Sequence, residues 1–175
     1  MIRIKNLLIL TIALMAAMPV AAKVKTKKTT ETATPREVIV PVDNLIAADG
    51  MVLLWPEGKM PNSRGVEVHD SIARQRIWMV GQPRIYAFMA TKSEQTGTSV
   101  LVIPGGGYVK QAYETAGITF AKWLNSLGIN AFVLLHRNPA SPDVEESSTV
   151  PTMDAQRAIK WIRSNATRLG IDPNR

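Results

Sequence analysis

The stretch from Val100 to Tyr108, VLVIPGGGY, constrains the fold more than any other part of this sequence. It joins four apolar residues to a proline and three consecutive glycines. An apolar run without polar alternation is typical of a strand buried on both faces of a mostly parallel sheet. Because glycine lacks a Cβ atom, the turn can adopt positive φ and bring successive N–H groups close to a ligand atom. We therefore expect a candidate anion or oxyanion site at the end of a buried strand.

The neighbouring residues exclude two interpretations of the triplet Gly105–Gly107. A dinucleotide-binding GxGxxG motif would need a glycine at Lys110 and an acid after the next strand, which ends in Leu135, His136 and Arg137. A phosphate loop would need a GK[ST] ending, which is absent. An oxyanion hole of the HGGG kind and a tight turn without chemistry both remain open.

A helix and a second strand are predicted after the glycines. Thr115 is a candidate N-cap for a helix over 116–127, and Gly128 stands where a left-handed residue ends a helix. The apolar face predicted for this helix consists of Ile118, Ala121, Trp123, Leu124 and Leu127. The apolar run Ile129–Leu135 predicts a buried strand that leaves an open sheet edge. Strand, helix and strand at this spacing form a right-handed crossover, which indicates the α/β class.

Other segments extend this predicted sheet. Ile77–Val80 and Arg84–Met89, separated by Gly81, Gln82 and Pro83, predict an antiparallel hairpin ahead of the mostly parallel sheet. Residues 38–42 predict a short edge strand, while the turn signals in 53–65 and the three prolines in 138–151 predict loops. The second loop leaves a strand at the edge where open α/β sheets bind ligands.

The end of the sequence predicts a second helix, capped by Thr149 or Thr152 and ended by Gly170. We interpret Asp154 as an acid of its first turn. Its predicted buried stripe consists of Ala155, Ala158, Ile159, Ile162, Ala166 and Leu169.

The amino terminus has the layout of a secretory signal peptide over 1–22, with Arg3 and Lys5 before an apolar run. An uncleaved anchor is the alternative, although the run is short for a bilayer. Residues 23–37, rich in Lys and Thr, predict a flexible leader, and 38–175 an α/β domain. We expect a periplasmic or secreted protein without stable membrane insertion after cleavage.

Composition excludes several classes of function. The net charge of +7 comes from the head of the chain, since 38–175 holds 14 basic and 12 acidic residues. We therefore expect no nucleic-acid partner. The absence of cysteine excludes disulfides, thiolate metal sites, a catalytic cysteine and a lipoprotein anchor.

Three segments in order, 100–108, 121–137 and 154–175, resemble the amino-terminal part of an α/β-hydrolase of the esterase/lipase type. The segment LWPEGKMPNSRG at 54–65 resembles secreted bacterial sugar-ester hydrolases of the acetylxylan and feruloyl esterase-like group. The resemblance spans roughly Trp55 to Arg175. It implies no metal and no organic cofactor.

By this resemblance the amides of Gly106 and Gly107, with Gly105 shaping the turn, hold a carbonyl oxygen as it becomes an oxyanion. Tyr108 flanks the acyl or sugar pocket, and Pro104 stands where the family commonly has a histidine. The family's nucleophile lies in a GxSxG elbow, with its acid and histidine later still, and none can be placed in this sequence. We therefore expect a fragment that ends one strand before its nucleophile and is inactive alone.

The remaining polar candidates do not match that pattern. His69 and His136 lie upstream of the expected elbow. His136 either lines the cleft or has a local structural role, and His69 is interpreted as a surface residue. Ser141, Ser147 and Ser148 lack the GxSxG surround, so they are assigned no nucleophilic role.

We expect the full-length parent to be a serine carboxylesterase acting through an acyl-enzyme on a small ester or an acylated polysaccharide, with acetyl or feruloyl groups as substrates. A prolyl-oligopeptidase-like serine peptidase is one alternative. A non-catalytic binding or scaffold domain on the same fold is the other.

Overall fold

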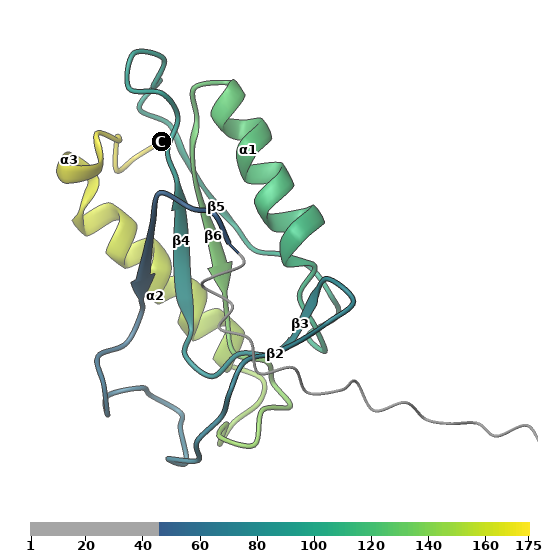
Figure 1. Ribbon diagram of the computed structural model, residues 1–175. Helices are drawn as coiled ribbons and strands as arrows, with labels where there is room; N and C mark the ends of the chain where they lie inside the picture. Colours follow the sequence, from purple (N-terminus) through teal and green to yellow (C-terminus); the bar gives the residue numbers. More distant parts are fainter. Residues whose placement is uncertain (1–45) are drawn as a thin grey trace, which may run out of the picture. The chain divides into compact units, whose positions relative to one another are not determined.

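The computed structural model describes residues 46–175 (Figure 1). The predicted signal peptide 1–22, leader 23–37 and edge strand 38–42 lie outside these residues. The described residues form a four-stranded sheet in the order β1-β4-β6-β5 and a separate two-stranded sheet of β2 and β3. The strands are β1 Gly50–Leu53, β2 Ser71–Ala73, β3 Arg76–Met79, β4 Arg84–Phe88, β5 Ser99–Val102 and β6 Asn130–Leu135.

The larger sheet is mixed, which agrees with the predicted α/β class. Strand β4 lies between β1 and β6 and runs antiparallel to both, with Arg84 opposite Leu135. Only β5 and β6 run parallel, with Val100 opposite Ala131. The prediction of a mostly parallel sheet is therefore wrong for the described residues. A helical crossover joins only β5 to β6, and a parallel pair needs such a crossover.

The predicted hairpin of 77–80 with 84–89 is also wrong. Strand β3 pairs with β2, and β4 pairs with β1 and β6 instead. Arg74 and Gln75 connect β2 to β3 with φ of 52° and 57°, the positive values that a two-residue hairpin turn needs. Neither residue is a usual turn former, so the pattern gave no sign of this turn.

Strand β6 occupies the middle of the sheet rather than an open edge. All six of its residues are buried, and it pairs with β4 on one side and β5 on the other. The edge strands are β1 and β5; in β5 only Val102 is buried, and Ile103 beyond it is 50% exposed. This strand order contradicts two predictions. Residues 100–103 are not buried on both faces of the sheet, and residues 129–135 do not form its open edge.

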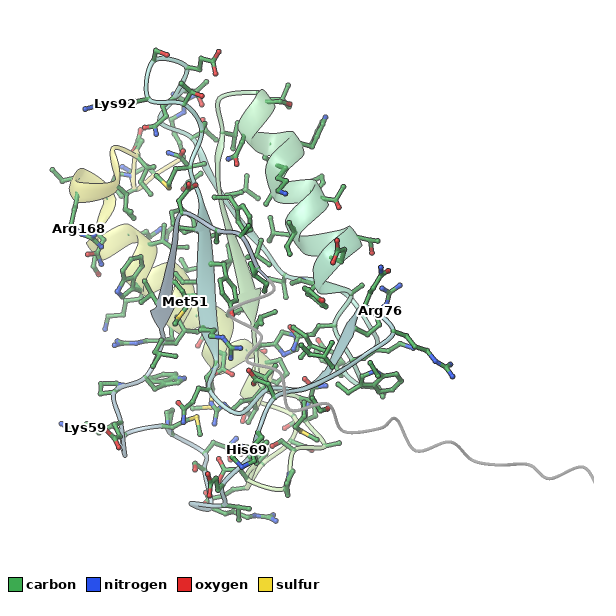
Figure 2. The ribbon with its side chains drawn as sticks, viewed as in Figure 1. Met51, Lys59, His69, Arg76, Lys92 and Arg168 are labelled. Carbon is green, nitrogen blue, oxygen red and sulfur yellow. The ribbon has the colours of Figure 1, made fainter. Side chains whose placement is uncertain are left out.

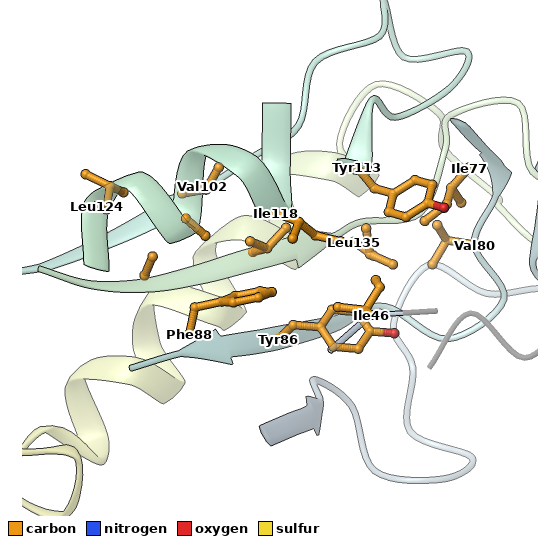
Figure 3. Close-up of a cluster of buried hydrophobic side chains, with 13 residues drawn as sticks. Ile46, Ile77, Val80, Tyr86, Phe88, Val102, Tyr113, Ile118, Leu124 and Leu135 are labelled. Carbon is orange, nitrogen blue, oxygen red and sulfur yellow. The ribbon is translucent and has the colours of Figure 1, made fainter. Parts of the chain in front are cut away.

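The sheet separates two apolar layers, because successive strand residues point to opposite faces. Tyr86, Phe88 and Leu135 pack with the helix between β5 and β6 (Figure 3). Ile85, Phe132 and Leu134 pack with the carboxyl-terminal helices on the other face. Helices therefore cover both faces of the sheet (Figure 1).

The first helix begins earlier than predicted. A π-helical turn, Tyr113–Ile118, leads directly into α1, Thr119–Ser126, so Thr115 is not its cap. Ile118, Ala121 and Leu124 are buried as predicted, whereas Trp123 is 53% and Leu127 is 49% exposed. Gly128 follows with φ of 71°, as its predicted position requires.

The second helix, α2, runs over Val150–Ser164 and is followed by α3, Ala166–Leu169. Thr149 precedes α2 but forms no side-chain capping bond. Ala158, Ile162 and Ala166 are buried as predicted, whereas Ile159 is 40% exposed. Gly170 ends α3 with φ of 68°. Across residues 46–175, no helix has the length and apolar character needed to cross a membrane.

Candidate functional site

The glycine turn and His136 lie at the same edge of the sheet. Gly105–Gly107 follow β5, and His136 directly follows β6. Because β5 and β6 are parallel, their carboxyl ends meet at one edge. The sheet thus brings together the two stretches that the sequence marked as candidates.

The carbonyl groups of the turn hold its shape. The Gly106 carbonyl accepts hydrogen bonds from the N–H groups of Val109 and Lys110, both at 3.3 Å, and the Gly105 carbonyl accepts from Ala112 at 2.9 Å. A Cβ atom added at Gly106 would overlap the carbonyl group of Lys110, so only glycine fits there. Gly107 has φ of 64°, a left-handed conformation that glycine adopts without strain.

The N–H groups of the turn have no hydrogen-bond acceptor among the described residues. Within residues 46–175, no hydrogen bond is donated by the N–H of Gly105, Gly106 or Gly107. An oxyanion hole needs fixed N–H donors aimed at a point where negative charge develops. The carbonyls of the turn fix its backbone, and its amides have no hydrogen-bond partner within residues 46–175, so these amides are candidates for such donors.

His136 is buried beside Tyr108. The two ring centroids are 6.3 Å apart in an edge contact, with Tyr108 64% exposed and at φ of 60°. The Nδ1 atom of His136 lies 2.8 Å from the carbonyl oxygen of Arg137. Burial lowers the pKa of His136 below its ordinary value, against the opposing effects of that bond and of the Asp154 charge. The neutral ring therefore donates from Nδ1 and keeps Nε2 as an acceptor.

Two buried amide side chains fix the residues that follow the glycines. Gln111 donates from Nε2 to the His136 carbonyl oxygen at 2.7 Å. Asn138 donates from Nδ2 to the carbonyl oxygens of Val109 and Trp78, at 2.8 and 3.0 Å. The turn is thereby tied to β6 and to β3. Sequence reasoning missed both residues, because an isolated amide carries no spacing signal.

A buried ion pair lies next to this edge. Asp154 accepts hydrogen bonds from Arg137 Nη2 at 2.8 Å and from Trp55 Nε1 at 2.8 Å. Arg137 Nη1 donates to the carbonyl oxygen of Pro61 at 2.8 Å. The prediction that Asp154 acts as a first-turn helix acid is therefore wrong, since its carboxylate is buried in this network. In the sequence, the only sign of this pair was that Arg137 and Asp154 both lie in segments that resemble the esterase/lipase type of α/β-hydrolase.

The other candidates lie apart from the turn. His69 is on the surface as predicted, and its Nε2 atom lies 3.5 Å from Glu67 Oε1. Ser141 is buried in the loop after β6, and Ser147 and Ser148 are exposed. Within residues 46–175, no three His, Asp or Glu side chains gather closely enough to hold a metal ion.

Two characterised proteins are similar in sequence. An acetylxylan esterase of Xylanibacter ruminicola is 30% identical over 79 residues, which make up 45% of this chain and 15% of that protein. An endo-1,4-β-xylanase B of Butyrivibrio fibrisolvens is 28% identical over 109 residues, covering 57% of this chain and 17% of its own length. No protein-family model matches the chain.

A solved structure is similar in fold. The acetyl ester-xyloside bifunctional hydrolase from Caldicellulosiruptor lactoaceticus superposes with a TM-score of 0.52 at 30% identity, over 75% of this chain and 42% of that protein. This chain resembles esterases of the α/β-hydrolase type. These similarities agree with the family resemblance inferred from the sequence around the glycine turn. The chain spans less than half of the length of each of the three proteins.

Proposed function

We propose that this chain is part of a serine carboxylesterase that removes acetyl or feruloyl groups from a plant polysaccharide or a similar small ester, and that Gly105–Gly107 form its oxyanion hole. The observation that carries the proposal is the set of three glycine amides that donate no hydrogen bond within residues 46–175. They lie at the carboxyl edge of the sheet, the same edge at which His136 follows β6. The similarity to an acetylxylan esterase supports the choice of an ester.

In the proposed reaction, a serine hydroxyl attacks the carbonyl carbon of the ester and forms a tetrahedral intermediate. The carbonyl oxygen becomes an oxyanion and accepts hydrogen bonds from the N–H groups of Gly106 and Gly107. Each such fixed donor contributes on the order of 3 kcal/mol to the stability of the transition state. The intermediate then expels the alcohol, and water hydrolyses the acyl-enzyme.

The sequence contains no GxSxG motif. In this proposal the nucleophile, its histidine and its acid therefore come from residues that this chain does not include. The described residues supply the oxyanion donors and one wall of the pocket.

Tyr108 and His136 form that wall. Tyr108 is exposed at the end of the glycine turn, and its ring makes an edge contact with the buried His136 ring. Burial favours the neutral form of the His136 imidazole, so this wall carries no charge there. We propose an exported enzyme, since the signal peptide predicted over 1–22 directs it out of the cytoplasm.

The decisive experiment compares two proteins. The 175-residue chain is assayed with 4-nitrophenyl acetate, and the product of the longer gene that contains it is assayed with acetylated xylan, methyl ferulate and a proline-containing peptide. We expect no turnover by the chain alone and ester hydrolysis by the longer protein. Saturable turnover by the repurified chain would contradict the placement of the nucleophile. Cleavage of the peptide alone would establish the peptidase alternative, and no turnover of any substrate would establish the scaffold.

A further inference from the structure

Asn138 lies where three segments of the chain meet. It follows the end of β6 and is only 1% exposed. Its Nδ2 group donates to the carbonyl oxygen of Val109, just beyond the glycine turn, and to that of Trp78 in β3. Its Oδ1 atom accepts a hydrogen bond from Gln111 Nε2 at 3.2 Å. One buried side chain therefore links the end of β6, β3 and the residues after the glycines.

Gln111 adds a second link from the same stretch. Its backbone pairs with Ile77 of β3 in both directions, at 2.7 and 3.0 Å. Its Nε2 group donates to the His136 carbonyl oxygen at 2.7 Å, whereas its buried Oε1 atom has no hydrogen-bond partner among the described residues. A buried acceptor without a partner is unfavourable. The favourable part of this side chain is therefore its pair of donor bonds.

The glycine turn depends on residues 109–112 for its position. The carbonyl oxygens of Gly105 and Gly106 accept hydrogen bonds from three N–H groups of that segment, at 2.9 to 3.3 Å. Glycine itself restricts the backbone little, because it has no Cβ atom. Tyr108, between the glycines and the segment, has φ of 60°, a left-handed value that a bulky residue adopts only where its surroundings impose it. Contacts that fix residues 109–112 therefore also fix the direction of the glycine amides.

We propose that Asn138, supported by Gln111, is a positioning residue of the oxyanion hole. It holds residues 109–112 against β3 and the end of β6, and so directs the N–H groups of Gly106 and Gly107 toward one point. The role in catalysis rests on the proposed function, whereas the effect on the turn rests on the hydrogen bonds alone. A donor stabilises the transition state best when it is in place before the charge develops. Loss of Asn138 should therefore lower kcat rather than raise KM.

Asn125 is a matched control for Asn138. Its Nδ2 group also donates to two backbone carbonyl oxygens, at 2.9 and 3.0 Å. It lies where β4 ends and β6 begins, whereas Asn138 lies beyond the end of β6. Figure 2 shows these two ends of the sheet, with Lys92, which follows β4, at one and His69, which precedes β4, at the other. Truncation of either asparagine removes the same kind of donor, but only one of them adjoins the glycine turn.

The first test uses the full chain labelled with ¹⁵N-glycine, in which the eleven glycines supply the amide signals. We expect the order parameters of the Gly106 and Gly107 amides to fall from about 0.85 toward about 0.6 in Asn138→Ala. Asn125→Ala should leave them unchanged. Circular dichroism checks that each variant is folded. Unchanged order parameters in a folded Asn138→Ala would overturn the proposal.

The second test uses the product of the longer gene and 4-nitrophenyl acetate, with active sites counted by a phosphonate ester that reacts once with the nucleophile. We expect kcat per active site to fall about tenfold or more in Asn138→Ala, with KM within about twofold of the parent value. Asn125→Ala should keep the parent's kcat per active site. A merely structural role would lower the number of active sites and not the kcat of each. An equal fall of kcat in both variants would overturn the proposal.

Gln111→Met keeps the proposal testable if Asn138→Ala fails to fold, because methionine has a similar volume and the backbone pairing with Ile77 does not need the side chain. It should lower the order parameters and kcat in the same direction but by less, since Asn138 keeps its own two donor bonds. No change of either quantity in Gln111→Met would then overturn the proposal.

The two tests separate the positioning role from the reaction. If the longer protein hydrolyses esters and kcat is unchanged in Asn138→Ala, the positioning proposal fails and the esterase proposal stands. If the order parameters fall in Asn138→Ala but the longer protein hydrolyses no ester, the hold of Asn138 on the turn stands and the esterase proposal fails.

Discussion

Arg137 and Asp154 form a fully buried, bidentate ion pair that links the residues after β6 to α2. Arg137 Nη2 lies 2.8 Å from Asp154 Oδ1, and Arg137 Nε lies 3.1 Å from Asp154 Oδ2. The backbone N–H of Arg137 also donates to Oδ2, at 2.9 Å. The pair fixes the backbone directly after His136, which is where the proposed pocket wall begins.

Removing one member of this pair should strongly destabilise the fold. Asp154→Ala leaves the Arg137 guanidinium buried without a counter-charge, so we expect a loss of about 3 to 5 kcal/mol in the free energy of unfolding. Asp172→Ala is the control, because Asp172 is half-buried and, among residues 46–175, its side chain accepts only a local bond from the N–H of Asn174. Urea unfolding followed by circular dichroism measures both. Equal losses for the two variants would show that the pair does not hold the two elements together.

The stability should depend on pH through His136. Burial lowers its pKa in the folded state, so the unfolded chain binds the proton more readily. The contribution of the neutral ring is complete above the ordinary histidine pKa of about 6.5 and decreases as the pH falls below it. Urea unfolding between about pH 5 and 8 should show this decrease, with a slope of at most about 1.4 kcal/mol per pH unit from this one group.

Two histidine variants identify the source of that slope. His136→Gln should flatten it, whereas His69→Gln, at an exposed position, should leave it unchanged. A slope that persists in His136→Gln would assign the pH dependence to other groups.

The glycines of the turn should differ in their tolerance of alanine. Gly106→Ala forces a Cβ atom into the carbonyl group of Lys110, so we expect a loss of more than about 1 kcal/mol. Gly105→Ala meets open space at a position without positive φ and should change stability by less than about 0.5 kcal/mol. Thermal unfolding of both variants checks this difference. An equally stable Gly106→Ala would mean that the turn does not pack against Lys110.

Two leucines near the end of α1 test which face of the helix is buried. Leu124 is 5% exposed and lies in the core, whereas Leu127 is 49% exposed. We expect a loss of about 2 to 5 kcal/mol for Leu124→Ala and less than about 1 kcal/mol for Leu127→Ala. Chemical unfolding gives both values. The reverse order would indicate that the helix is rotated about its axis.

Much of the local structure could be predicted from the sequence. The apolar run 129–135 predicted a buried strand, and Gly128 and Gly170 predicted helix ends, which their positive φ values confirm. These predictions hold because they depend on short-range causes: hydrophobic spacing, and a left-handed conformation that glycine tolerates. The role of the glycine amides stays a prediction, although the turn leaves them without partners in the described residues.

The order of the strands could not be predicted in the same way. An apolar strand such as 77–80 can pair with either neighbour in sequence, and the choice of β2 depended on a turn of Arg74 and Gln75. The exposure of Trp123 likewise depended on how far α1 rotates against the sheet. Each outcome is set by contacts between distant segments, and a local pattern does not contain them.

The sequence by itself determined an α/β fold with a triglycine turn after one apolar strand and a second apolar strand beyond a helix. Only the tertiary structure decided that β6 is central, that Asp154 pairs with Arg137, and that Asn138 links β3 to the residues after the glycine turn. The physical reason is that burial and electrostatic pairing depend on which surfaces meet, and residues 17 to 60 positions apart meet only when the sheet is assembled.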